Sequence, residues 1–161
     1  MLPAHNTVMV DGVDPHHDAQ SWDLSTQVDE LKSPLRQGPD YEFVEGGHDG
    51  FMQLANPVWI TRKVLHLQPD IYVIIDVAKT SGEHQYQQAF HYDARGTVTP
   101  ADHLAGFRAG QVVATRVFDP RPTVALAARE QSDPYNRKVG NQKVQSPVTS
   151  PGNHTLSTVL A

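Results

Sequence analysis

The chain has no cysteine, which excludes a disulfide or a thiolate metal site. It also has no apolar run near the roughly 20 residues that a membrane-spanning helix needs. Its 13 basic residues are outnumbered by 18 acidic ones, and no basic stripe is interleaved with aromatic residues. These features argue against nucleic acid and membrane as partners. The first residues contain neither the basic leader nor the apolar segment of a signal peptide.

Charge is distributed unevenly along the 161 residues, whose formal net charge is -5. Residues 1–50 contain ten acidic and two basic residues, whereas residues 51–161 contain eight acidic and eleven basic ones. One interpretation is two solvated faces of opposite sign. The other is a groove for an anionic polymer, lined by Arg62, Lys63, Arg108, Arg116 and Arg121.

Apolar residues alternate with a period of two through most of the chain, which is typical of β-strands. The 12 prolines and 11 glycines favour short strands joined by turns. Residues 58–67 and 71–77 flank a Gln-Pro-Asp turn and predict a hairpin at the centre of a sheet, its second strand buried on both faces. The other predicted strands are 7–10, 22–28, 41–44, 51–54, 84–92, 112–118, 123–128 and 156–160.

Three segments depart from this pattern. Residues 28–32 and 101–105 are compatible with a helical turn. Residues 129–153 are polar and contain three prolines, which predicts a long polar loop. The length suits one domain, and short strands separated by turn signals predict an all-β fold, an antiparallel β-sandwich or a barrel.

Seven short motifs occur in order along the chain. They are HNTVMVDG at 5–12, FVEGGHDGF at 43–51, RKVL at 62–65, PDIYVIID at 69–76, GEH at 82–84, FHY at 90–92 and LSTVL at 156–160. Together they resemble segments of the heparinase II/III-like polysaccharide lyases. One departure is Ile60-Thr61-Arg62, where that family often has His-x-Arg.

The resemblance implies that residues 1–161 are the later, β-sandwich part of a larger protein that begins with an α-helical toroid, so we expect the domain to be incomplete at its N-terminus. It implies β-elimination on uronate-containing polysaccharides that are heparin-like, heparan-sulfate-like or alginate-like. The family's catalytic tyrosine and histidine residues precede the matched segment. We therefore expect no catalytic residue here and no activity of this chain alone. The resemblance also implies a periplasmic or secreted parent protein.

Three residues receive predicted site roles. The resemblance implies that His5 is a ligand of a structural zinc ion in the parent, joined by ligands from upstream, because one imidazole cannot hold zinc alone. Arg62 is a predicted substrate-binding residue, since a guanidinium binds carboxylate or sulfate in a bidentate way. Its alternative is a cross-strand ion pair. His48, in a glycine-rich turn or bulge, is predicted to face the substrate or to be structural.

Two other interpretations stay open. One is a noncatalytic carbohydrate-binding or scaffold β-sandwich. The other is a small metal-dependent β-barrel enzyme that uses His5, His16, His17 and Asp18, although adjacent histidines on a strand face opposite ways. We interpret His66, His84 and His91 as packing or surface residues. Exposed sheet edges predict that the chain associates with itself.

Overall fold

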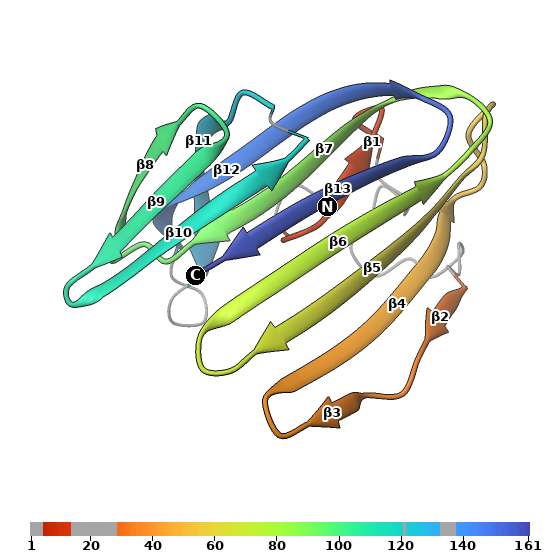
Figure 1. Cartoon of the computed structure of the whole chain (residues 1–161). Coiled ribbons are helices and arrows are strands. Elements are labelled where there is room, and N and C mark those ends of the chain that lie inside the picture. Colours follow the sequence, from red (N-terminus) through yellow and green to blue (C-terminus); the bar gives the residue numbers. More distant parts are fainter. Residues whose placement is uncertain (1–4, 14–28, 121, 133–137) are drawn as a thin grey trace.

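The computed structural model describes residues 5–13, 29–120, 122–132 and 138–161, which form two antiparallel β-sheets and, within those ranges, no helix (Figure 1). The predicted antiparallel β-sandwich is confirmed. No described segment is a helix able to cross a membrane. The strands are β1 (Val8–Val10), β2 (Glu30–Lys32), β3 (Arg36–Gly38), β4 (Tyr41–Phe51), β5 (Val58–Leu67), β6 (Ile71–Lys79), β7 (Glu83–Tyr92), β8 (Thr97–Ala101), β9 (Leu104–Ala109), β10 (Val112–Asp119), β11 (Ala125–Ser132), β12 (Lys138–Pro151) and β13 (His154–Leu160).

The two sheets differ in width. The smaller sheet has the strand order β1-β7-β12-β11, and the larger has the order β2-β4-β5-β6-β13-β10-β9-β8 with β3 alongside β4. The β5–β6 hairpin lies inside the larger sheet, as the alternation around the Gln-Pro-Asp turn predicts.

The core lies between the sheets in two clusters. In one cluster, Val10 and Tyr86 of the smaller sheet meet Phe51 and Val58 of the larger. In the other cluster, Phe90, Tyr92 and Val144 of the smaller sheet meet Val98, Ala105 and Phe118 of the larger. Strand β7 supplies Tyr86, Gln88, Phe90 and Tyr92 from one face, as its predicted alternation requires.

The predicted loop at 129–153 is wrong. Residues 125–132 form β11 and residues 138–151 form β12, which lies between β7 and β11. Polar composition misleads here because β12 buries Asn141, Lys143 and Ser146 as well as Val144. The prolines at 147 and 151 are tolerated because β11 pairs with β12 only as far as Gln145, so the far end of β12 lies along no partner strand on that side among the described residues.

Four smaller predictions also need correction. Residues 101–105 form the β8–β9 hairpin turn, with Asp102 in the left-handed region at φ 53°, and no helical turn. Residues 30–32 of the segment 28–32 are strand β2, while residue 28 and the strand predicted at 22–28 lie outside the described residues. In segment 51–54 only Phe51 is in a strand. Finally, β6 is covered on one face only, since Asp76 is buried whereas Ile71 is 40% exposed.

Candidate functional site

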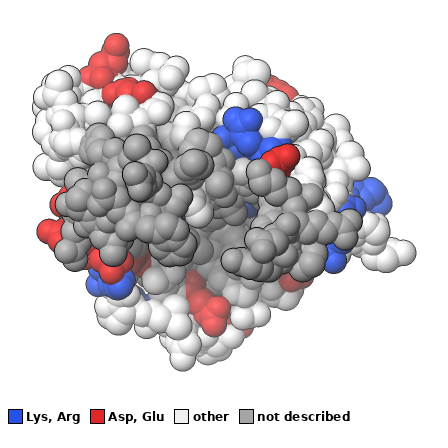
Figure 2. All heavy atoms as spheres, turned by 180° about the vertical axis from the view of Figure 1, so that it is seen from behind, with Lys and Arg blue, Asp and Glu red and all other residues white. Residues whose placement is uncertain are grey.

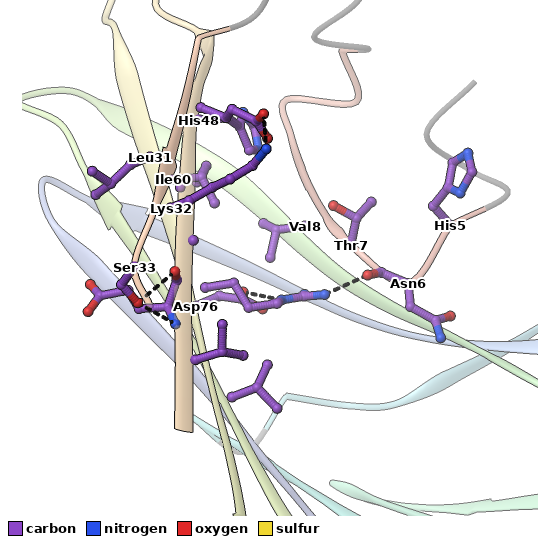
Figure 3. A pocket seen from close by; sticks show the side chains of 17 residues that line it. His5, Asn6, Thr7, Val8, Leu31, Lys32, Ser33, His48, Ile60 and Asp76 are labelled. Carbon is purple, nitrogen blue, oxygen red and sulfur yellow. Dashed lines mark hydrogen bonds and ion pairs between the residues drawn. The ribbon is translucent and has the colours of Figure 1, made fainter. Parts of the chain in front are cut away.

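A groove of about 890 Å³ opens beside β1. Its floor is the inner face of β4 and β5, where Val44, Gly46 and His48 lie opposite Val64, Arg62 and Ile60 in register. Strand β2 with Leu31 and Lys32 forms one wall, and the segment that leads into β1 forms the other (Figure 3). The groove thus lies where the wide sheet extends beyond β1, the edge strand of the narrow one.

All three residues with predicted site roles line this groove. His5 is exposed and lies on the β1 side, across the groove from His48 (Figure 3). The Nδ1 atom of His48 accepts a hydrogen bond from the Gly50 amide at 3.2 Å. The β4–β5 register shifts between His48 and Phe51, so His48 adjoins the bulge that the glycine-rich motif predicts. His5, His48 and Arg62 thus share one groove, and the roles of these three residues stay predictions.

Arg62 forms the cross-strand ion pair that was one of its two predicted states. Its Nε and Nη2 atoms donate to the two carboxylate oxygens of Asp76 at 2.6 and 2.8 Å. The Asp76 side chain is 2% exposed and that of Arg62 is 27% exposed. Asp76 therefore lies buried at the base of the groove, and Arg62 extends from it toward the opening. A third donor, Nη1, reaches the backbone oxygen of Asn6 at 2.5 Å. These bonds use three of the five N–H groups of the guanidinium, and the other two have no acceptor among the described residues.

The Asp76 carboxylate is anchored from the opposite sheet. Gln88 of β7 donates its side-chain N–H to Asp76 at 2.6 Å. The Thr158 hydroxyl of β13 donates to the side-chain oxygen of Gln88 at 2.6 Å. Both residues are 1% exposed. A buried charge needs such partners, because desolvation destabilises it by several kcal/mol.

Asn6 ties the groove wall to β7. Its side-chain oxygen accepts from the His91 amide at 2.7 Å, and the backbone oxygen of Thr7 accepts from the Ala89 amide at 2.9 Å. Asn6 and Thr7 therefore continue the β1–β7 hydrogen bonding beyond the start of β1 at Val8. His5 is the next residue outward, so its backbone is placed by these bonds.

Among the described residues, the lining of the groove carries no net positive charge. Its two Lys or Arg residues are both paired: Lys32 with Glu30, and Arg62 with Asp76. Glu45 also lines it. On the face shown in Figure 2, outside the grey atoms, basic side chains occur in separate small groups rather than in a continuous band.

The predicted five-residue basic groove is not formed. Of its four members that the structure describes, only Arg62 lines the groove. Lys63 is its neighbour on β5 and faces the other way. Arg116 is buried with its guanidinium carbon 3.7 Å from the centre of the Phe90 ring. Arg108 lies on β9, and Arg121 lies outside the described residues.

The fit of the groove to zinc is incomplete. Among residues 5–13, 29–120, 122–132 and 138–161, no group of three or more His, Asp or Glu side chains could hold a metal ion. His5 therefore lacks a complete ligand set within that part of the chain. The alternative set of His16, His17 and Asp18 lies outside the described residues.

A second polar cluster lies at the other end of β1. His84 is 4% exposed, which agrees with its interpretation as a packing residue. Its Nδ1 atom is 2.7 Å from an Asp11 oxygen, and its Nε2 atom is 3.3 Å from the Thr80 hydroxyl. Asp11 also accepts from the Gln85 amide at 2.8 Å. The cluster fastens the end of β1 to the β6–β7 turn.

Burial shifts the pKa of two groups near Phe90. It raises the pKa of the Tyr92 hydroxyl, and Arg116 acts in the opposite direction. It lowers the pKa of the Arg116 guanidinium, which the Tyr92 hydroxyl partly offsets. Tyr92 thus stays a protonated strand aromatic, as its place in the predicted strand suggests.

Sequence reasoning missed Asn6, Asp76 and Gln88 as parts of the site. A signal for Asp76 was present, because it is the single acidic residue in the run Ile71–Val77. An acidic residue in a strand that faces the core requires a partner. The partner's identity depends on the β5–β6 register, which places Arg62 opposite Asp76.

Comparisons with known proteins agree on the fold. Heparan sulfate lyase HepC from Pedobacter heparinus superposes with a TM-score of 0.75 at 10% identity, over 98% of this chain and 24% of that one. A heparinase III gene product gives 0.77 at 13% identity, over 97% of this chain and 23% of that one. A 4-alpha-glucanotransferase from Thermococcus litoralis gives 0.54 at 6% identity, over 79% and 22%.

The chain spans about a quarter of the length of the two lyase structures. A comparison with curated proteins gave no match. A model of the family "Heparinase II/III-like, C-terminal" matches residues 1–156, which is nearly the whole sequence. The chain therefore belongs to the heparinase II/III-like C-terminal domain family.

Proposed function

We propose that this chain is the C-terminal β-sandwich of a polysaccharide lyase that cleaves uronate-containing chains by β-elimination. The observation that supports this most is the family match over residues 1–156, together with a groove that collects His5, His48 and Arg62. Elimination removes the proton beside the uronate carboxylate and expels the glycosidic oxygen. It needs a base, an acid and a group that stabilises the charge of the intermediate.

In this proposal the groove binds the polymer, and catalytic groups come from polypeptide outside this chain. The two N–H groups that Arg62 has left, with His48 on the same floor, contact the polymer's carboxylate and hydroxyl groups. Zinc at His5 stays a prediction that requires ligands from outside the described residues. A periplasmic or secreted location of the parent is part of the same proposal.

The charges of the groove disfavour a heavily sulfated polymer, because its described lining has no net positive charge. Both of its cations are already paired, and residues 1–31 contain no lysine or arginine. Binding by this chain should therefore depend weakly on salt, since few long-range attractions are available to be screened. Unsulfated uronate oligosaccharides, such as those of alginate, are the preferred ligands of this part of the site.

Titration of the chain with an alginate oligosaccharide and with heparin of equal length tests the proposal. We expect weak binding of the alginate oligosaccharide, lost in Arg62→Lys, which keeps a cation beside the buried Asp76, and no increase in ultraviolet absorbance from an unsaturated product. Elimination by the chain alone would contradict the placement of catalysis elsewhere. Tight binding without any need for Arg62 would support the noncatalytic carbohydrate-binding alternative instead.

A further inference from the structure

We propose that Asp76 and Arg62 form the positioning pair of the groove. Asp76 orients the Arg62 guanidinium onto the Asn6 backbone oxygen, and this contact holds His5 at the groove's rim. The consequence of this positioning for ligand binding rests on the proposed function above.

The geometry of the ion pair fixes the direction of the third donor. Two parallel N–H···O bonds to Asp76, at 2.6 and 2.8 Å, define the plane of the guanidinium. Within that plane Nη1 is the remaining nitrogen, and it points at the Asn6 oxygen, as the dashed line that reaches Asn6 in Figure 3 shows. A lysine amine is a single point donor and could not hold both partners in this way.

The carboxylate in turn is held from the opposite sheet. Gln88 donates to Asp76, and Thr158 orients Gln88, so the carboxylate has a fixed place in the core. A series of contacts therefore runs from Thr158 through Gln88, Asp76 and Arg62 to Asn6. It joins both sheets to one exposed segment, and a pair that only stabilised the core would not need its last contact.

Asn6 is the residue through which the contact reaches His5. Its backbone oxygen receives Arg62, and its side-chain oxygen receives the His91 amide. Loss of the Arg62 contact removes one of these two hydrogen bonds from Asn6, which is exposed. We expect the segment to move more while the sandwich stays folded.

Two variants of the full chain separate positioning from folding. Asp76→Asn removes the bidentate acceptor. Arg62→Lys keeps a cation beside Asp76 and leaves the bond between Gln88 and Asp76 intact, but removes the contact with Asn6. Lys63→Gln is the control, because Lys63 is the next residue, faces away from the groove and forms a longer pair with Glu45, at 3.9 Å.

Amide hydrogen exchange at His91 and Ala89 and the imidazole resonances of His5 are the readouts, together with thermal melting. A hydrogen bond to a charged group contributes enough that we expect exchange at His91 to rise about tenfold in Arg62→Lys. We also expect the His5 resonances to move toward those of an unfolded peptide. Lys63→Gln should leave both unchanged.

The proposal is overturned if Arg62→Lys is folded and keeps wild-type exchange at His91 and wild-type His5 resonances. It is equally overturned if both variants only lower the melting temperature. None of these readouts involves a polysaccharide. A failure of the chain to bind alginate oligosaccharides would therefore contradict the proposed function and leave the positioning pair standing.

Discussion

The Asp76 carboxylate is 2% exposed and accepts three hydrogen bonds, two from Arg62 and one from Gln88. At this depth an unpaired charge is costly, so each partner matters more than it would at the surface. Arg62 contributes both to the core and to the groove, because its Nη1 atom donates to the backbone oxygen of the exposed Asn6. One side chain thus links stability to the placement of the site.

Asp76→Ala should lower the free energy of unfolding by about 3–5 kcal/mol, because it leaves the Arg62 guanidinium and the Gln88 amide without their acceptor. Lys63→Ala breaks a partly exposed pair and should lower it by about 0–1 kcal/mol. Chemical denaturation of both variants measures the difference. Equal losses would show that the Arg62–Asp76 pair has no special weight in the core.

Strands β4, β5 and β6 meet around His66. Its Nε2 atom is 3.1 Å from the Pro69 oxygen, its Nδ1 atom is 3.3 Å from Glu42, and its ring stacks on Tyr72 at 4.2 Å. The Pro69 carbonyl, followed by Glu42, raises the pKa of His66 above its ordinary value of 6.5. Both contacts favour the protonated ring, which can donate from each nitrogen.

The pH dependence follows from that direction. Because the pKa is raised in the folded chain, His66 stabilises the fold fully below pH 6.5, and this contribution disappears as the pH rises through the raised value. An NMR titration should place the midpoint of His66 above 6.5. Glu42→Gln should lower the midpoint only in part, since Pro69 is the larger cause. A midpoint at or below the ordinary value would contradict these contacts.

Two adjacent glycines in β4 face different surroundings. A Cβ atom at Gly47 would lie 2.9 Å from the Ile60 backbone oxygen, whereas one at Gly46 would lie 3.5 Å from the Leu31 oxygen. Gly47→Ala should therefore destabilise the chain by about 1–3 kcal/mol through overpacking. Gly46→Ala should be close to neutral, because it also restricts the unfolded chain. Thermal melting of the pair decides, and equal melting temperatures would refute the close β4–β5 approach at Gly47.

The sequence predicts elements well where one face is buried and alternation is clean, as in β5 and β7. It fails at β12, because a strand between two others can bury polar groups such as Lys143, and composition then indicates a loop. It names His5 through the family resemblance, Arg62 from guanidinium chemistry and His48 from its glycine-rich turn, but it does not place the three in one groove. It does not predict Asn6 or Gln88, because their roles depend on which sheet faces which, a non-local property.

At the scale of the whole molecule, the outer face of the larger sheet carries an apolar row. Phe43, Leu65, Val73, Val159 and Val117 lie opposite one another across five strands. Val117 and Val159 are each 37% exposed. An apolar row that is exposed at Val117 and Val159 and partly buried at its other members favours association. The association through sheet edges expected from the sequence stays a separate prediction.

Light scattering of the chain should show association that grows with concentration. A double variant, Val117→Lys with Val159→Glu, should reduce it by removing apolar contact area from the row. Thr155→Lys lies on the same face of β13 but outside the row, and it should have little effect. A monomer at every concentration would show that the row does not drive association.

The proposed function requires that the groove beside β1 contributes to a polysaccharide site. An NMR titration of the chain with an unsulfated uronate oligosaccharide tests this requirement. We expect shifts concentrated at Asn6, Gly46, His48 and Arg62, reduced in Arg62→Lys and little changed by salt. Shifts confined to another face, or no shifts at millimolar oligosaccharide, would contradict it.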